Sequence, residues 1–279
     1  MPQTRHPIET VDTQDETVQL VQLTDTHLCR LRGGTLLGMD TDHSLQAVIN
    51  LVQKERPVID LLLGTGDLSD GGAGSAYERL QDYFDQLTSV NYWLPGNHDD
   101  RAAMEAVAAT PARLCREIRL PRWQILLLDS QIVGHVGGEL GEAELMLLER
   151  SLAAAQEEGR HTLVCLHHQP VAIGSEWLDQ QRVADADAFF KVLDRYTGIK
   201  AVLWGHVHQE IDRIRNGVRL LASPSTCVQF APGSERFKVD DQPPGYRWLE
   251  LHSDGRFDTG VSRVWDTQFT VDLDSGGYL

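Results

Sequence analysis

Val18-Gln-Leu-Val-Gln-Leu23 is followed directly by Thr24-Asp-Thr-His27. The apolar run predicts a strand, so the polar residues would stand immediately after its end. Polar residues follow four further predicted strands in the same way, as Gly66-Asp67, Pro95-Gly-Asn-His-Asp99, His167-His168 and Gly205-His-Val-His208. In an α/β sheet, ligands bind beyond the carboxyl ends of the strands. We therefore expect these five loops to meet at one edge of a sheet and to form one site.

Apolar patterning predicts strands and helices in alternation up to residue 204. The predicted strands are 18–23, 58–63, 90–94, 125–128, 162–166 and 201–204, and the predicted helices are 43–55, 77–87, 141–158 and 184–196. This alternation is typical of an α/β protein with a parallel or mixed sheet covered by helices. Later segments, at 210–214, 219–221, 246–251 and 257–264, predict short antiparallel strands that extend the first sheet or pack on it.

The sequence contains no internal repeat and no change of composition that would mark a linker. We expect one domain over residues 18–265, a mobile N-terminal tail over 1–17 and a C-terminal arm over 266–279. The proline-containing region 231–244 could serve as a lid or as a dimer contact, and the sequence does not separate these alternatives.

Charge and cysteine content narrow the class of protein. The 279 residues include 25 Lys and Arg and 41 Asp and Glu, for a formal net charge of −16, which argues against a binder of nucleic acid or of anionic membranes. The first residues contain no signal-peptide core, and no apolar run approaches the length of a membrane span. The four cysteines are isolated in the sequence and predict free thiols in a reducing cytoplasm.

Two pairs of polar residues have the same spacing. Asp25 and His27 are two residues apart, as are His206 and His208, and an extended backbone would point both members of a pair in one direction. Each pair could then hold one metal ion. Oxygen and imidazole donors without thiolate favour Mn, Fe, Zn or Co over a structural zinc site. The glycines at 66, 96 and 205 suit sharp turns or close approach to a bound group.

These blocks resemble the calcineurin-like metallophosphoesterases, whose pattern is D-x-H, G-D, G-N-H-[DE], H and G-H-x-H in that order. The sequence is most similar to the bacterial class III cyclic nucleotide phosphodiesterases of that family. That similarity lies in Gln22-Leu-Thr-Asp-Thr-His-Leu28, Leu37-Gly-Met-Asp-Thr41, Gly66-Asp-Leu-Ser-Asp70 and His167-His-Gln-Pro170. The resemblance implies a four-layer α/β/β/α sandwich with two mixed sheets.

The resemblance also implies a dinuclear metal centre. Its ligands would be Asp25, His27, Asp67 and His208 for one ion and Asp67, Asn97, His167 and His206 for the other, with Asp67 as the bridge. Fe and Mn are the ions expected first, with Zn or Co as alternatives. A hydroxide between the ions would be the nucleophile, and the centre would keep the net positive charge needed to attract a phosphodiester.

The expected activity is hydrolysis of 3′,5′-cyclic AMP to 5′-AMP, with His98 and Asn97 as catalytic residues. The substrate would lie against His27, Asp67, Asn97, His98 and His208. His98 could bind a phosphate oxygen or protonate the leaving oxygen, with Asp99 orienting it. The alternative is another small phosphodiester: a 2′,3′-cyclic nucleotide, a glycerophosphodiester or a nucleotide-sugar lipid. A homodimer is expected from the resemblance alone.

Other features bound this interpretation. The second block lacks the arginine of the protein Ser/Thr phosphatases, which argues against that activity. Cys29 and Gly71 depart from the cyclic phosphodiesterase pattern. His168 could be a partner of a metal ligand or a pocket residue. The tryptophans at 93, 123 and 204 suit a core, and Ser223-Pro-Ser-Thr-Cys227 suits a plain loop, although its position would also allow contact with substrate.

Overall fold

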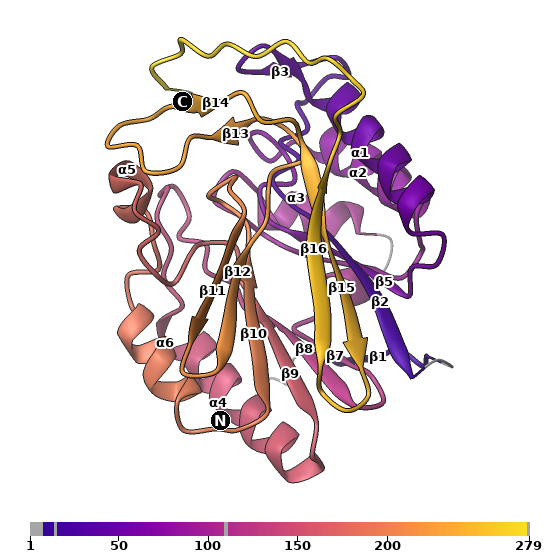
Figure 1. Cartoon of the computed structure of the whole chain (residues 1–279), viewed down its shortest axis with the longest axis vertical. Helices are drawn as coiled ribbons and strands as arrows, with labels where there is room; N and C mark the ends of the chain where they lie inside the picture. The colour runs from indigo at the N-terminus through magenta and orange to yellow at the C-terminus, as the bar shows by residue number, and fades with distance from the viewer. Residues whose placement is uncertain (1–7, 14–15, 109–110, 278–279) are drawn as a thin grey trace.

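Two mixed β-sheets lie face to face in the computed structural model, which describes residues 8–13, 16–108 and 111–277. Helices α1 (Thr41–Glu55) and α2 (Gly74–Asp85) cover the outer face of one sheet. Helices α4 (Gly141–Glu158) and α6 (Ala186–Leu193) cover the outer face of the other (Figure 1). The α/β/β/α sandwich with two mixed sheets is therefore confirmed.

The larger sheet has the strand order β1-β7-β8-β9-β10-β12-β11 among the described residues. Its strands are β1 (Ile8–Thr10), β7 (Glu117–Arg119), β8 (Trp123–Leu127), β9 (His161–Cys165), β10 (Ile199–Trp204), β11 (Ile211–Arg215) and β12 (Val218–Ala222). Strands β8, β9, β10 and β12 run parallel, whereas β7 and β11 are antiparallel to β8 and β12. The carboxyl ends of β9 and β10 therefore lie at the same edge.

The smaller sheet has the order β16-β15-β2-β5-β6 in the described part of the chain. Its strands are β2 (Thr17–Leu23), β5 (Leu61–Thr65), β6 (Asn91–Leu94), β15 (Gly245–His252) and β16 (Phe257–Arg263). Strands β2, β5 and β6 run parallel, and the hairpin β15–β16 adds to β2 in antiparallel fashion. The late antiparallel strands thus extend both sheets, because β11–β12 joins one and β15–β16 the other.

The remaining elements are short. They are α3 (Arg101–Val107), α5 (Glu176–Asp179), the 3₁₀ turn η1 (Pro111–Leu114), and the strand pairs β3 (Thr35–Leu36) with β4 (Met39–Asp40) and β13 (Gln229–Phe230) with β14 (Val239–Asp240). The region considered as a lid or dimer contact includes the β14 strand of the second pair. No helix in the described ranges combines the length and hydrophobicity needed to cross a membrane.

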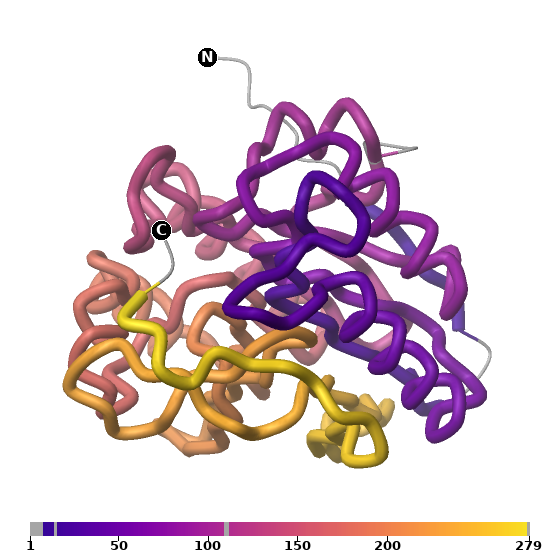
Figure 2. Tube along the Cα trace, turned by 90° about the horizontal axis from the view of Figure 1, so that it is seen from above, coloured from indigo at the N-terminus to yellow at the C-terminus, as the bar shows by residue number. Residues whose placement is uncertain are grey.

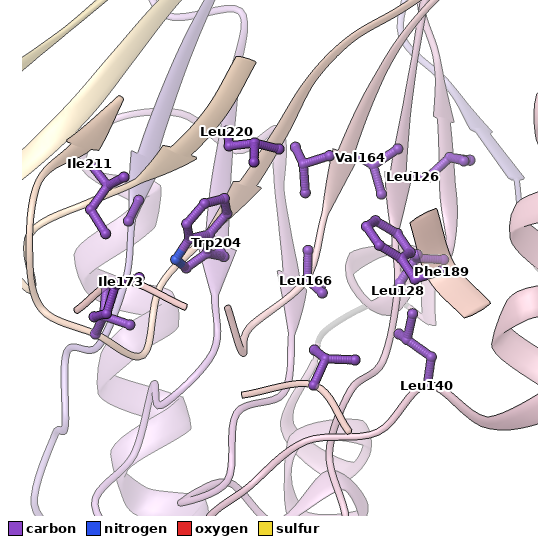
Figure 3. Close-up of a cluster of buried hydrophobic side chains, with 14 of the residues drawn as sticks. Leu126, Leu128, Leu140, Val164, Leu166, Ile173, Phe189, Trp204, Ile211 and Leu220 are labelled. Carbon is purple, nitrogen blue, oxygen red and sulfur yellow. The ribbon is translucent and has the colours of Figure 1, made fainter. Parts of the chain in front are cut away.

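The core lies in three layers because the central strands are covered on both faces. In β5, Leu61 and Leu63 join the cluster between the two sheets, whereas Leu62 packs with residues of α1 and α2. Figure 3 shows the third cluster, where Val164 of β9 lies near Phe189 of α6. Burial of apolar side chains on both faces is the main favourable contribution to the free energy of folding of such strands. This packing fixes the strand ends from which the loops emerge.

The structure describes part of each chain end. Residues 8–10 of the expected tail form β1, which pairs in parallel with β7, while residues 1–7 and 14–15 lie outside the described residues. The described part of the C-terminal arm runs across the molecule beside the N-terminal third (Figure 2), and Asp272 N donates to Leu37 O at 2.7 Å. Both segments are tied to the domain by backbone hydrogen bonds. The domain boundaries themselves stay a prediction.

Candidate metal centre

The five loops predicted to meet do so at the carboxyl ends of β2, β5, β6, β9 and β10. Backbone hydrogen bonds join them: Asp25 N donates to Gly66 O at 3.0 Å, and Gly205 N donates to His167 O at 3.2 Å. His206 N donates to the carboxylate of Asp25 at 3.1 Å. The loops come from both sheets, so the site lies where the two layers meet. All seven expected metal ligands belong to these loops.

The backbone of the site is left-handed at five of the expected ligands. The φ angles are positive at Asp25 (53°), His27 (44°), Asp67 (50°), His206 (61°) and His208 (49°). Non-glycine residues adopt such angles rarely, and they concentrate at functional sites. The expectation that an extended backbone directs each pair of ligands was wrong. The strands end at Leu23 and Trp204, and left-handed turns point the side chains inward.

Three glycines allow the loops to approach one another closely. A Cβ at Gly66, whose φ is +93°, would lie 2.3 Å from His167 Nδ1. A Cβ at Gly96 would lie 2.2 Å from Asp67 Oδ1, and one at Gly205 would lie 2.2 Å from Thr24 Oγ1. These distances are shorter than van der Waals contact, so no side chain can be accommodated at any of the three positions. The group that each glycine makes room for is another residue of the site.

Two imidazoles are held by backbone carbonyls. Nδ1 of His167 lies 2.9 Å from Thr65 O, and Nδ1 of His208 lies 2.8 Å from Val228 O. Their Nε2 atoms face the carboxylates, at 3.1 Å from Asp67 and 3.2 Å from Asp25 respectively. A hydrogen bond from one ring nitrogen to a carbonyl is the usual way in which a ligating histidine is oriented. The geometry leaves both Nε2 atoms directed into the centre of the site.

The two buried carboxyl groups stay ionised. Burial acts to raise the pKa of both groups, but at Asp25 the neighbouring His208 and His167 together outweigh burial and lower the pKa of that group. At Asp67, burial is again opposed by His167 and His98, which hold its pKa well below the usual range. Burial acts to lower the pKa of His167, yet the charge of Asp67 raises it to about 9. Both carboxylates are therefore anionic at neutral pH.

His98 lies at the edge of the site, and its surroundings differ from the sequence expectation. Its backbone N donates to Asp67 Oδ1 at 2.8 Å, and its Nδ1 lies 3.5 Å from Asp70 Oδ1. Burial would lower the pKa of His98, but Asp67 and Asp70 raise it to about 9. Asp99 does not orient His98: its carboxylate accepts hydrogen bonds from the backbone of residues 68, 69 and 96 and from Tyr77. Asp70 takes the place expected for Asp99.

The donor atoms fit a metal centre. Asp25, His27 and His208 each offer one ligand atom, and these three atoms lie within 4.8 Å of one another. Asp25, Asp67 and His167 form a second group that meets the same distance limit and shares Asp25 with the first. Asn97 Oδ1 and His206 Nε2 are buried without a hydrogen-bond partner among the described residues. Buried polar atoms without partners cost free energy unless a ligand satisfies them. Oxygen and imidazole donors in this arrangement suit transition-metal ions.

Several residues have structural roles. Ser225 Oγ donates to Asp25 O at 2.7 Å, so the run 223–227 supports the first loop. The tryptophans at 93, 123 and 204 are buried in the core, as expected. Sequence reasoning did not identify Asp70, although it stands in the quoted second block. Phe230 was also missed, and its ring stacks on His208 with centroids 4.2 Å apart.

Comparisons with known proteins agree with this geometry. The chain is 48% identical to a protein of Pseudomonas aeruginosa named 3′,5′-cyclic adenosine monophosphate phosphodiesterase CpdA, over 95% of this chain and 96% of the relative. It is 44% identical to the protein of the same name in Escherichia coli K12, over 94% and 95% of the two chains.

A solved structure, GAP50, the anchor in the inner membrane complex of Plasmodium, has a TM-score of 0.63 and 13% identity. The alignment covers 90% of this chain and 86% of that chain, and at this identity the likeness concerns the fold alone. The sequence profile described as calcineurin-like phosphoesterase matches residues 18–210, and the chain therefore belongs to the calcineurin-like phosphoesterase family.

Proposed function

We propose that this chain is a metal-dependent phosphodiesterase that hydrolyses 3′,5′-cyclic AMP to 5′-AMP. The observation that carries the proposal is the convergence of buried carboxylate and imidazole donors on one centre. Two relatives named as 3′,5′-cyclic AMP phosphodiesterases align with the chain over nearly their whole length, which supports this substrate. The high content of acidic residues adds support, because it disfavours a polyanionic substrate such as nucleic acid.

The proposed metal ligands are those expected from the sequence. One set is Asp25, His27, Asp67 and His208, and the other is Asp67, Asn97, His167 and His206. Fe and Mn are the proposed ions, with Zn and Co as alternatives that the same donors accept. When bound, two such ions supply Lewis acidity toward phosphoryl oxygens and lower the pKa of a water molecule.

The remaining chemistry belongs to side chains of the protein. His98 is the proposed catalytic residue, because its imidazole is held beside the centre by the backbone contact with Asp67 and faces Asp70. Charged at neutral pH, it can donate a hydrogen bond to a phosphate oxygen or a proton to the leaving 3′ oxygen. His27, Asp67, Asn97 and His208 complete the proposed substrate contacts.

The direct test is hydrolysis by purified protein that is stripped of metal and then supplied with Mn²⁺. We expect release of 5′-AMP that depends on metal and is lost in Asp67→Ala. The same protein should be offered a 2′,3′-cyclic nucleotide, a glycerophosphodiester and a nucleotide-sugar lipid at equal concentration. Faster turnover of any of these, or two bound ions with no turnover of cyclic AMP, would contradict the proposed substrate.

We also propose a cytoplasmic location and a homodimer. The four cysteines are free thiols in the structure, and three of them are buried, which suits a reducing compartment. The dimer rests on the family resemblance. Light scattering coupled to gel filtration measures the mass directly, and a mass near 31.2 kDa at assay concentration would rule the dimer out.

A further inference from the structure

The side-chain amide of Gln131 reaches from the loop after β8 to the loop after β6. Its Nε2 lies 2.7 Å from Gly96 O and 2.6 Å from Asp99 O. A carbonyl oxygen only accepts hydrogen bonds, so both contacts identify this atom as the amide nitrogen, which has one hydrogen for each carbonyl. Asn97 and His98 lie between the two carbonyls in the sequence. One amide group thus spans the turn that carries a proposed metal ligand and the proposed catalytic residue.

The turn from Gly96 to Asp99 is also held by its own N–H groups. Asp99 N donates to Gly96 O at 3.3 Å, and Gly96 N donates to the Asp99 carboxylate at 2.9 Å. His98 N donates to Asp67 Oδ1 at 2.8 Å, which ties the turn to the carboxylate proposed to bridge the two ions. These contacts engage the N–H groups at 96, 98 and 99, whereas Gln131 engages the carbonyl groups at both ends. The amide is therefore the part of this network that the loop after β8 supplies.

Gln131 is itself held in place. Its backbone N donates to Asp129 Oδ1 at 2.9 Å, and Asp129 N donates to Glu144 Oε2 of α4 at 3.0 Å. The other carboxylate oxygen of Asp129 pairs with Arg101 at the start of α3. Gln131 also forms an isolated β-bridge with Gly138. The loop that presents the amide is thus anchored to two helices, which makes the amide a fixed support for the turn.

We propose that Gln131 is a positioning residue: its amide fixes the turn from Gly96 to Asp99 and thereby the place of the His98 imidazole. The inference rests on the proposed function, in which His98 acts on the phosphodiester. The ring of His98 is half-buried, and its centroid lies 4.9 Å from that of His27 in the centre of the site. Movement of the turn therefore moves this ring relative to the site. Displacement of a reacting group by about 1 Å can lower a rate by about 100-fold.

The first measurement needs neither metal nor substrate. Hydrogen–deuterium exchange of metal-free protein is followed in peptides that cover residues 95–101. Gln131→Met keeps about the same side-chain length but removes both donated hydrogen bonds. We expect exchange in this segment to become about 10-fold faster, because local opening of the turn no longer breaks those two bonds. Gln131→Glu places an oxygen against both carbonyls and should accelerate exchange at least as much.

The second measurement distinguishes positioning of His98 from a merely structural role. Hydrolysis of cyclic AMP is measured for the unaltered protein, for Gln131→Met, for His98→Ala and for the double variant. We expect kcat to fall about 10-fold in Gln131→Met, but by no more than about twofold when His98→Ala is already present, because the positioned group is then absent. Metal is supplied in excess, so that weaker ion binding through Asn97 does not limit the rate.

Gln53→Met is the matched control, since Gln53 Nε2 also donates to a backbone carbonyl, that of Gln86, from the exposed side of α1. It should change neither exchange in the segment nor kcat. Thermal unfolding checks that each variant folds, and Gln131→Glu carries the test if Gln131→Met does not fold. Unchanged exchange in residues 95–101, or an equal fall in kcat with and without His98, would overturn the inference. Absence of hydrolysis by the unaltered protein would instead overturn the proposed function, and the exchange measurement would still decide whether Gln131 holds the turn.

Discussion

At the scale of single residues, the centre combines backbone conformations and charges that are unfavourable without a cation. Five of the expected ligands adopt left-handed backbone angles, and Asp25 and Asp67 are both buried. Each such backbone angle costs about 1–3 kcal/mol and persists only where the surroundings impose it. Metal ions would offset these terms by neutralising the carboxylates and by engaging Asn97 Oδ1 and His206 Nε2.

Metal removal should therefore lower the stability of the protein. A ligand at about 100 times its Kd stabilises the folded state by about 2.7 kcal/mol, which raises the Tm of a protein of this size by about 5 °C. We expect a rise of that order when Mn²⁺ or Zn²⁺ is added to stripped protein, measured by calorimetry. In Asp67→Ala, the addition of metal should raise the Tm only slightly. An unchanged Tm in the unaltered protein would argue against tight binding.

His98→Ala should separate catalysis from metal binding. The side chain of His98 faces Asp70, whereas its backbone N, which the substitution keeps, contacts Asp67. We expect a metal content near that of the unaltered protein and a fall in cyclic AMP hydrolysis of about 100-fold, the usual scale for a positioned acid or hydrogen-bond donor. Elemental analysis and initial rates on one preparation provide both numbers. Activity equal to that of the unaltered protein would remove His98 from the mechanism.

At the scale of elements, the loop after β6 packs so closely against the loop after β5 that no side chain fits at Gly96. A Cβ at Gly96 would lie 2.2 Å from Asp67 Oδ1 and 2.7 Å from His167 Nε2. Gly96→Ala should displace both side chains and abolish binding of at least one ion, with the fold preserved by the layers below. Metal content and circular dichroism check this. Gly134→Ala is a control with open space around its Cβ, although its φ of +78° adds some local strain.

Elements with strong local signals could be predicted from the sequence, and those defined by tertiary contacts could not. The sequence predicts helix α4 with both of its ends, and in the structure Gly159 terminates it in the left-handed conformation. Strand β7 has only three residues, which is too short to show a hydrophobic periodicity, so the sequence does not predict it. The strand predicted at 58–63 begins at Leu61, since Val58 is apolar but 57% exposed.

The same distinction holds within the site. The meeting of five loops could be predicted because parallel strands end at the same edge. The partner of His98 could not be predicted, because Asp99 is its neighbour in the sequence whereas Asp70 is distant from it. The structure shows that the Asp99 carboxylate is instead engaged by Tyr77 and by the backbone of residues 68 and 96. The assignment of strands to two sheets was also beyond local patterns, since β15 pairs with β2, which lies far away in sequence.

At the scale of the whole molecule, a chain of buried polar contacts joins the two sheets beneath the centre. Arg247 of β15 donates to Ser223 Oγ at 3.1 Å and to the carbonyl of Ala222 in the other sheet at 2.8 Å. Ser223 donates to Gln22, which donates to Thr65 Oγ1 at 2.7 Å. The backbone oxygen of Thr65 is the one that orients His167. The packing of the layers and the orientation of a proposed ligand are therefore connected.

Arg247→Ala should accordingly weaken both the fold and the site. Burial lowers the pKa of this guanidinium to about 10, and its hydrogen bonds go to neutral oxygens of both sheets. Its removal leaves a cavity and unsatisfied carbonyls, so we expect the free energy of unfolding to fall by about 3 kcal/mol or more, measured with urea. Arg195→Ala, which removes a surface ion pair with Glu149, should change it little. If the network also positions His167, metal affinity in folded Arg247→Ala should fall at one ion only. Equal loss at both ions would instead indicate general loosening of the sandwich.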